Sequence, residues 1–201
     1  MKYILMCGDP TNERHLVKIK GEPLVARTIR QLEAEGVKEI FISSVNSRMA
    51  SYGKLLVHDN KRAYGLSGGY WVDAFYPMNE PVCYIFGDVV FTDEAIKKIV
   101  KTETNSIEFF ASAPPFAKDY PKKHAESFAF KVEDYELFNK AVERTKRLQD
   151  AGKFMREPIS WELWQVIKGT TLNNIIYTNY IVINDSTCDI DKIEDAEYYN
   201  G

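Results

Sequence analysis

The sequence predicts an α/β protein in which helices cover both faces of a mainly parallel sheet. Apolar strand-like runs alternate with amphipathic helical segments through residues 1–105, and these runs are apolar on both faces, as in a sheet that is buried on both sides. The 201 residues have 45% hydrophobic content and show no composition shift that marks a second core. We therefore expect a single domain with a three-layer, Rossmann-like architecture and a mainly parallel mixed sheet.

The chain opens with a strand, a loop, a helix and a second strand. The run YILMCG at 3–8 is an apolar strand that ends at a glycine. Residues 23–35 have helical spacing, with Pro23 suited to the first turn and Gly36 to the position just past the end. The segment KEIFISS at 38–44 is the next strand, so these elements form a βαβ unit.

The same alternation continues to residue 101. We expect a strand in KLLVH at 54–58, a helix at 70–76 that follows Gly68 and Gly69, and a strand in VCYIFG at 82–87. The helix predicted at 93–101 has acidic residues in its first turn and lysines later, an order that the helix dipole favours.

The second half of the chain extends the same layered sheet. We expect strands in IEFFASA at 107–113 and SFAFKV at 127–132, and a strand in YIVIN at 180–184. The expected helices lie at 135–151, at 158–167 and in a short acidic stretch that runs to the last residue. No repeat, linker or low-complexity tract separates these elements.

Composition excludes several classes of protein. The net charge is −3 and the pI is about 5.7, with no basic stripe, so nucleic acid is not the expected partner. No apolar run approaches the roughly 20 residues of a membrane helix, and no signal segment is evident, so we expect a cytoplasmic protein. The three cysteines lack metal-ligand spacing and are expected to be buried thiols.

Isolated polar residues give weaker signals. His15, His58 and His124 lie far apart without paired ligand spacing, so we expect ordinary surface or loop positions. Glu126 and Glu162 are either surface charges or groups that bind an acceptor's hydroxyls, and surface charge is the simpler interpretation.

Ligands of open parallel sheets bind outside the carboxyl ends of the strands, so the loops there are the expected site. In the loop after the first strand, Gly8 allows close backbone approach to a ligand, and Arg14 and Lys18 are suited to phosphates. Gly68 and Gly69 precede the predicted helix at 70–76, where free N–H groups can face an anion. A simple turn remains the alternative for each glycine.

The stretch YIFGDVVF at 84–91 places Asp88 directly behind an apolar strand. A carboxylate at such an edge is either a solvated turn residue or a ligand for Mg²⁺, which takes few protein ligands and completes its shell with water and substrate phosphates.

Four segments in order resemble nucleotidyltransferases of the MobA-like and sugar-phosphate or alcohol-phosphate type. They are ILMCG, the run from RHLVKIKGEPL to FISS, YIFGDVVF and CDIDKIED, and the resemblance covers nearly the whole chain. KIKGEPLVARTI is similar to the family's P-x-x-G-K-P-L stretch. Gly87 and Asp88 match its metal-binding Gly-Asp, and Asp191 matches the aspartate of its closing motif, with Asp189 as the alternative.

The resemblance implies a nucleotide-diphospho-sugar transferase-like fold and Mg²⁺-dependent transfer of NMP from an NTP to a phosphorylated acceptor. It implies that residues 1–105 bind the nucleotide and 106–201 the acceptor. The implied nucleotide-binding residues are Met6, Cys7, Gly8, Gly68, Gly69 and Gly87. The implied catalytic residues are Arg14, Lys18 and Asp88, and the implied metal ligands are Asp88 and Asp191.

One departure from the family leaves two rivals open. The loop CGDPTNERH is shorter than the family's glycine-rich signature, and Arg14 stands where a lysine is expected. A catalytically silent nucleotide-binding protein of the same fold is therefore one rival. The other is a glycosyltransferase that uses a nucleotide sugar, because residues 189–191 have the D-x-D form. The nucleobase, the acceptor and the oligomeric state are not encoded in readable motifs.

Overall fold

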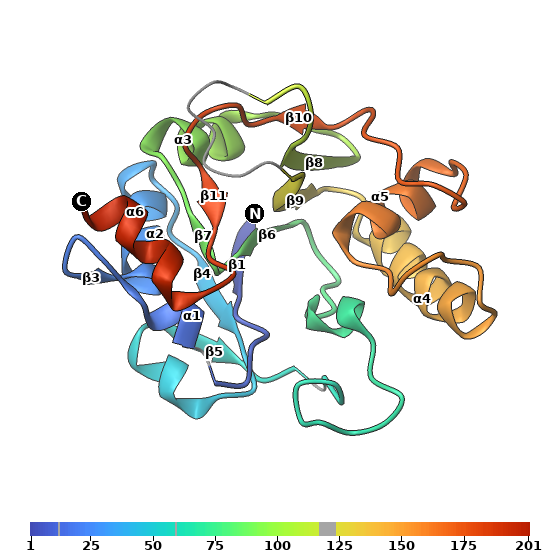
Figure 1. Cartoon of the computed structure of the whole chain (residues 1–201), viewed down its shortest axis with the longest axis horizontal. Coiled ribbons are helices and arrows are strands. Elements are labelled where there is room, and N and C mark those ends of the chain that lie inside the picture. Colours follow the sequence, from blue (N-terminus) through green and yellow to red (C-terminus); the bar gives the residue numbers. More distant parts are fainter. Residues whose placement is uncertain (12, 59, 117–123) are drawn as a thin grey trace.

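A seven-stranded sheet forms the centre of the molecule, with strand order β10-β8-β9-β6-β1-β4-β5 (Figure 1). The structure is a computed structural model that describes residues 1–11, 13–58, 60–116 and 124–201. The strands are β1 (Lys2–Met6), β4 (Ile40–Ser43), β5 (Lys54–Leu56), β6 (Val82–Phe86), β8 (Ile107–Ser112), β9 (Glu126–Val132) and β10 (Ile181–Val182). Within the sheet, β9 alone runs antiparallel to its neighbours. The predicted mainly parallel mixed sheet is confirmed.

Helices cover both faces of this sheet. The long helices are α2 (Leu24–Ala34), α3 (Asp93–Lys101), α4 (Tyr135–Asp150) and α5 (Ser160–Lys168). Helices α2 and α3 lie on one side and α4 and α5 on the other (Figure 1). Aromatic residues fill the layer under α4 and α5, where Phe109 stacks on Phe130 with ring centroids 4.5 Å apart. The predicted three-layer, single-domain α/β architecture is therefore confirmed.

The remaining elements are short. They are α1 (Glu13–Leu16), β2 (Lys18–Ile19), β3 (Glu22–Pro23), η1 (Ser47–Ser51), η2 (Trp71–Ala74), β7 (Val89–Val90), β11 (Cys188–Asp189), η3 (Ile193–Ala196) and α6 (Glu197–Asn200), where η marks a 3₁₀ helix. Strand β11 pairs antiparallel with β7, which places a segment near the C-terminus beside the loop that follows β6.

The prediction of a helix at 70–76 is wrong, because this segment forms only the 3₁₀ turn η2. Phe75 leaves the turn in an extended conformation and is buried against Tyr84 and Phe130. Pro77 disfavours helical geometry at the residue before it, so the turn cannot grow into a helix. The last strand of the sheet is also shorter than predicted and contains only Ile181 and Val182.

A buried lysine caps helix α3. The Nζ of Lys131, on β9, donates to the carbonyl oxygens of Ile99, Val100 and Thr102 at 3.1, 2.8 and 2.6 Å. Burial lowers the pKa of Lys131. These carbonyls are among those that a helix leaves without intrahelical partners at its C-terminus, and a cation there also interacts favourably with the helix dipole.

We predict that Lys131→Met lowers the free energy of unfolding by about 1–3 kcal/mol, because the last carbonyls of α3 lose their shared donor. Urea denaturation followed by circular dichroism measures the loss. Lys97→Met, at an exposed position on the same helix, is the matched control and should change stability by less than about 0.5 kcal/mol. Equal stability of the two variants would contradict the capping role.

All three cysteines are buried and none forms a disulfide, as the sequence predicts. Within the described ranges, no helix combines the length and the hydrophobicity needed to cross a lipid bilayer.

Candidate functional site

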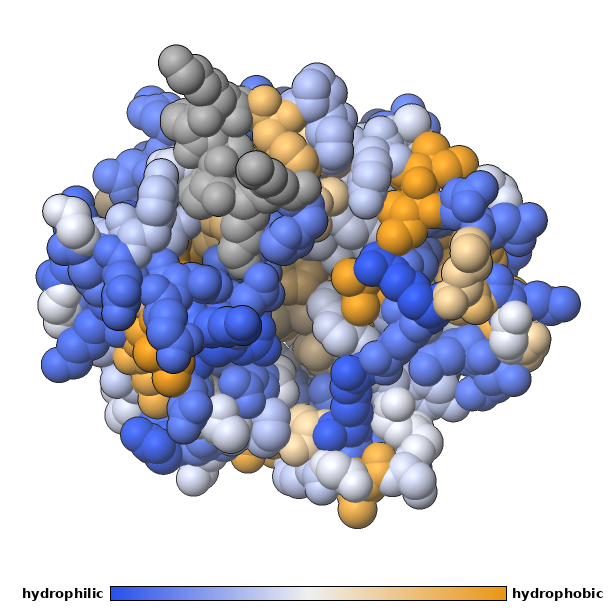
Figure 2. All heavy atoms as spheres, in the orientation of Figure 1, coloured by the Kyte–Doolittle hydropathy of each residue, from blue (hydrophilic) through white to orange (hydrophobic). Residues whose placement is uncertain are grey.

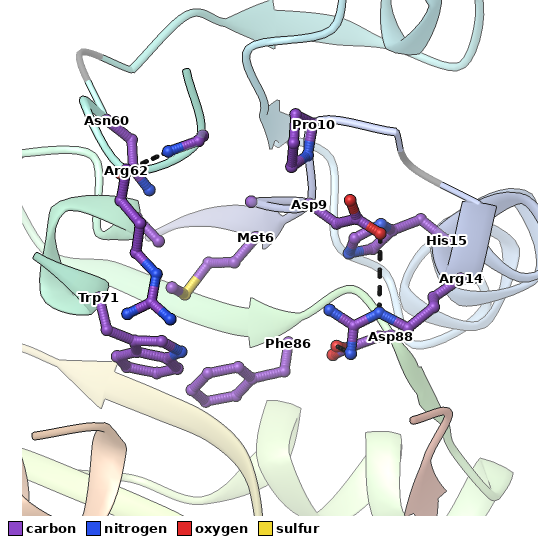
Figure 3. Close-up of a pocket in the computed structure, with 13 residues that line it drawn as sticks. Met6, Asp9, Pro10, Arg14, His15, Asn60, Arg62, Trp71, Phe86 and Asp88 are labelled. Atoms are coloured by element: carbon purple, nitrogen blue, oxygen red, sulfur yellow. Dashed lines mark hydrogen bonds and ion pairs between the residues drawn. The ribbon is translucent and has the colours of Figure 1, made fainter. Parts of the chain in front are cut away.

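A pocket of about 310 Å³ opens at the carboxyl ends of β1 and β6 (Figure 3). Met6 and Gly8 from the first of these strands line it, together with Phe86 and Asp88 from the second. The two strands pair in register, with Met6 opposite Phe86, so their following loops lie side by side. Figure 2 shows a hollow in this face of the molecule, with hydrophilic side chains around much of it. This pocket therefore lies at the sheet edge where the sequence predicts a ligand site.

Arg14, from α1, forms an ion pair with Asp88 inside this pocket. Its Nη1 lies 3.0 Å from Asp88 Oδ2 and its Nε lies 3.7 Å from Asp9 Oδ2. The same Nη1 donates to the carbonyl oxygen of Ile190 at 3.4 Å. Partial burial acts to raise the pKa of Asp9, but hydrogen bonds from Thr11 and the nearby cationic groups lower it overall. Arg14 is thus held between two carboxylates and the segment near the C-terminus.

Gly87 is required by the close approach of the two central strands. Its N–H donates to the carbonyl oxygen of Met6 at 3.0 Å. A Cβ at this position would lie 2.7 Å from Cys7 Sγ and 2.8 Å from that carbonyl oxygen. The glycine therefore allows the strand end to lie close enough to β1 for Asp88 to reach the pocket. Cys7 itself is fully buried beneath this contact and does not line the pocket.

The expectation of an ordinary surface or loop position is wrong for His15, whereas His58 lies in the loop after β5. His15 lines the pocket and is 2% exposed, because α1 turns it back against the strand ends. His58 is also 2% exposed, and its Nδ1 lies 2.6 Å from the Oγ of buried Ser43. His124 is exposed, as predicted. Burial, followed by the charge of Arg14, lowers the pKa of His15 from 6.5 to about 4, so this ring is neutral at pH 7.

We predict that acidification from pH 6.5 to about 4 destabilises the protein partly through His15. The unfolded chain binds a proton on this ring in that range and the folded protein does not, so stability falls as the pH falls. His15→Gln should flatten the dependence of the unfolding free energy on pH by up to about 1.4 kcal/mol per pH unit. Urea titrations of both proteins across this range measure the two slopes. The carboxylates are the same in both proteins, so their contribution cancels in the comparison. Identical slopes would contradict the prediction.

Arg62 and Trp71 also line the pocket, although neither is among the site residues that the sequence predicts. Figure 3 shows the Arg62 guanidinium beside Trp71, whose ring stacks on Phe86 with centroids 5.9 Å apart. Arg62 also forms an ion pair with Glu157, from the segment between α4 and α5. One feature of the sequence could have indicated Arg62. The basic pair Lys61-Arg62 lies just beyond the strand at 54–56, and this strand runs parallel to β1 and β4, so its loop follows at the same sheet edge.

Other predicted site residues lie outside the pocket. Lys18 is exposed on β2, and the described pocket lining does not include it. Gly68 has a φ of +77° and borders a different cavity, next to His58. Gly69 packs against the backbone of Arg62, where an added Cβ would lie 2.2 Å from the Arg62 nitrogen. The two glycines therefore shape the loop that presents Arg62.

The segment near the C-terminus joins the site through β11. Asp189 pairs with Val89, and the Ile190 N–H donates to the carbonyl oxygen of Asp88 at 2.7 Å. Asp191 follows, with 49% of its side chain exposed and its Oδ2 3.7 Å from His124 Nε2. Asp88 and Asp191 offer hard carboxylate oxygens of the kind that Mg²⁺ takes, so this donor chemistry fits the ion. The Arg14 pair occupies one oxygen of Asp88.

Glu126 and Glu162 are not surface charges, so that expectation is wrong. Glu126, the first residue of β9, is 7% exposed and lies 2.6 Å from His124. Glu162 accepts the backbone N–H of Ile159 at 3.1 Å and an Arg156 hydrogen bond at 2.6 Å. It therefore stabilises the start of α5, whereas Glu126 lies against β11 near Asp191.

Comparison with known proteins supports the fold. No protein-family model matches the sequence, and no curated protein matches it. The structure is similar to the crystal structure of a protein from Bacillus anthracis assigned as a glucose-1-phosphate thymidylyltransferase, in complex with sucrose. The TM-score is 0.57 at 13% identity, and the match covers 100% of this chain and 94% of the other. The chain thus has the fold of that protein over its whole length.

Proposed function

We propose that this protein is a nucleotidyltransferase that transfers NMP from a nucleoside triphosphate to a sugar phosphate or alcohol phosphate and releases pyrophosphate. The observation that carries the proposal is the Arg14–Asp88 ion pair in a pocket at the carboxyl ends of β1 and β6. The segment that leads to Asp191 is joined to this edge by the hydrogen bond from the Ile190 N–H to the Asp88 carbonyl oxygen. The fold shared with a protein assigned as a glucose-1-phosphate thymidylyltransferase is consistent with this reaction class.

In the proposed reaction, a phosphate oxygen of the acceptor attacks the α-phosphorus of the triphosphate. A new P–O bond forms, the bond between the α-phosphorus and its bridging oxygen breaks, and pyrophosphate leaves with that electron pair. This displacement depends on alignment of the reactants and neutralisation of charge more than on covalent help from the protein. A pocket with two arginines and two nearby carboxylates suits these needs without a nucleophilic side chain.

The pocket residues have separate roles in this scheme. Gly8 allows the triphosphate to approach the backbone, and Arg14 and Arg62 neutralise its charge, so Arg62 takes the role that the sequence assigns to Lys18. Trp71 offers an aromatic wall for the nucleobase. Asp88 and Asp191 would hold Mg²⁺, which when bound screens the phosphate oxygens from each other. In this scheme residues 1–105 bind the nucleotide and 106–201 the acceptor.

Arg62→Met tests the assignment of the pocket to a triphosphate. The protein is incubated with Mg²⁺, each of ATP, CTP, GTP, UTP and dTTP, and a panel of phosphorylated sugars and alcohols, and pyrophosphate release is measured. We predict release with one triphosphate, and a KM for it that rises roughly tenfold in Arg62→Met, because one charge-assisted phosphate contact is lost. Arg48→Met, at an exposed position outside the pocket, is the control.

Two other outcomes would replace the proposal. One observation favours a nucleotide-sugar glycosyltransferase. Asp189 and Asp191 flank the fully buried Ile190 and so keep the D-x-D form that suggests this function. Turnover of nucleotide sugars without pyrophosphate release from triphosphates would establish that function. The shortened stretch CGDPTNERH at 7–15 favours a catalytically silent binding protein. Thermal stabilisation by a triphosphate without turnover of any acceptor would establish that one.

A further inference from the structure

We propose that Glu126 forms a transition-metal site with His124 and Asp191. The ligand atoms of these three side chains all lie within 4.8 Å of one another. His124 Nε2 lies 2.6 Å from Glu126 Oε1 and 3.7 Å from Asp191 Oδ2. The inference rests on the proposed function for the role of the ion. In this site Asp191 would share an ion with His124 and Glu126, and these three ligands would select a transition metal.

The three residues come from two segments that are far apart in the sequence. Glu126 begins β9, His124 lies two residues before it, and Asp191 follows β11, which packs against β9. The side chain of Glu126 is 8% exposed, whereas those of His124 and Asp191 are 60% and 49% exposed. The buried carboxylate is a fixed ligand, and the two outer side chains leave an open path for an ion to enter.

The distances suit a metal ion after a small movement. Zinc binds imidazole nitrogen and carboxylate oxygen at about 2.0–2.2 Å, so two ligand atoms on one ion lie about 3.0–3.5 Å apart. The separation of His124 and Asp191 is close to this range. Opening the contact between His124 and Glu126 by less than about 1 Å, through rotation of the exposed imidazole, would bring that pair into it as well.

The chemistry of the ligands selects the class of metal. One imidazole and two carboxylates suit Mn²⁺, Co²⁺ or Zn²⁺, whereas Mg²⁺ is bound through oxygen ligands. Asp88 belongs to neither of the two candidate metal-ligand groups found among the described residues, and its Oδ2 pairs with Arg14. The second group contains Glu126, Cys188 and Asp189, so Glu126 is the residue that the two groups share.

The position of this site gives the ion a specific role. It lies at the start of β9, in the half of the chain that the proposed function assigns to the acceptor. An ion held there would offset the charge of the acceptor's phosphate, while Arg14 and Arg62 neutralise the triphosphate. Two anionic substrates would then have separate sources of positive charge.

Cobalt binding tests the site without any measurement of activity. The chelator-treated protein is titrated with Co²⁺ and followed by visible absorption and by calorimetry. We expect one Co²⁺ per chain, with d–d bands and no thiolate charge-transfer band, because Cys188 is not a member of the proposed site. His124→Ala should weaken binding at least tenfold, since removing even an outer partner of a metal ligand costs about 10–100-fold.

Two variants separate loss of a ligand from loss of the fold. Glu126→Gln should also weaken Co²⁺ binding at least tenfold, and circular dichroism checks that the variant folds; if it does not, exposed His124 supplies the test. Glu136→Gln, an exposed position on α4, should bind Co²⁺ like the wild type. Undiminished binding in His124→Ala, a strong thiolate band, or no Co²⁺ binding would overturn the inference. None of these results would decide whether pyrophosphate is released.

Discussion

Asp88→Asn is expected to lower the rate of pyrophosphate release by more than about 100-fold, which corresponds to about 3 kcal/mol of lost transition-state stabilisation. The carboxylate is the acidic group that lines the pocket at the end of β6, and it orients Arg14 through a 3.0 Å ion pair. An amide keeps the shape and can still accept a hydrogen bond from the guanidinium. It loses the charge that would bind a cation beside the triphosphate.

The fold of Asp88→Asn should persist, because the contact with β11 uses the backbone carbonyl of Asp88 and not its side chain. Thermal unfolding and single-turnover pyrophosphate release are measured on the same preparation. Glu94→Gln removes one carboxylate charge from the exposed first turn of α3 and should keep the wild-type rate. If the Asp88→Asn variant releases pyrophosphate at a near-normal rate, the assignment of this carboxylate to catalysis is wrong.

Gly87→Ala is expected to lower the free energy of unfolding by about 2–3 kcal/mol, the upper part of the range for overpacking a core. The added Cβ would lie 2.8 Å from the carbonyl oxygen of Met6, 2.7 Å from Cys7 Sγ and 3.0 Å from His15 Cδ2. Met6 lies on β1, which pairs with a strand on each side, so its carbonyl cannot move without disturbing the sheet. Relief must therefore come from displacement of Gly87 and of the Asp88 that follows it.

Gly8→Ala provides the matched comparison at the same sheet edge. Its Cβ would meet the Cβ of Ala74 at 3.5 Å, an ordinary van der Waals contact, so we expect a change within about 0.5 kcal/mol. Urea denaturation of both variants measures the two effects. Equal stabilities would show that the strand ends can separate at little cost, and the argument from close approach at residue 87 would then be wrong.

The helices at 24–34, 93–101 and 135–150 and the strands around β1 and β6 were predictable because hydrophobic periodicity is a local property. The same local reasoning identified the edge residues Gly8 and Asp88, since a glycine or a carboxylate directly after an apolar strand is visible in the sequence. The sequence therefore determined the α/β class, the mainly parallel sheet and the edge at which the pocket lies.

The tertiary structure alone decided which distant residues meet there. Pairing of β11 with β7 brought the segment of residues 188–190 beside Asp88, α1 buried His15 at the pocket, and the loop after β5 placed Arg62 in the pocket lining, where Lys18 is absent. Periodicity states which face of an element is buried, but it carries no information on which segments become neighbours. Those contacts depend on strand order and on loops whose conformations are stabilised by the whole molecule.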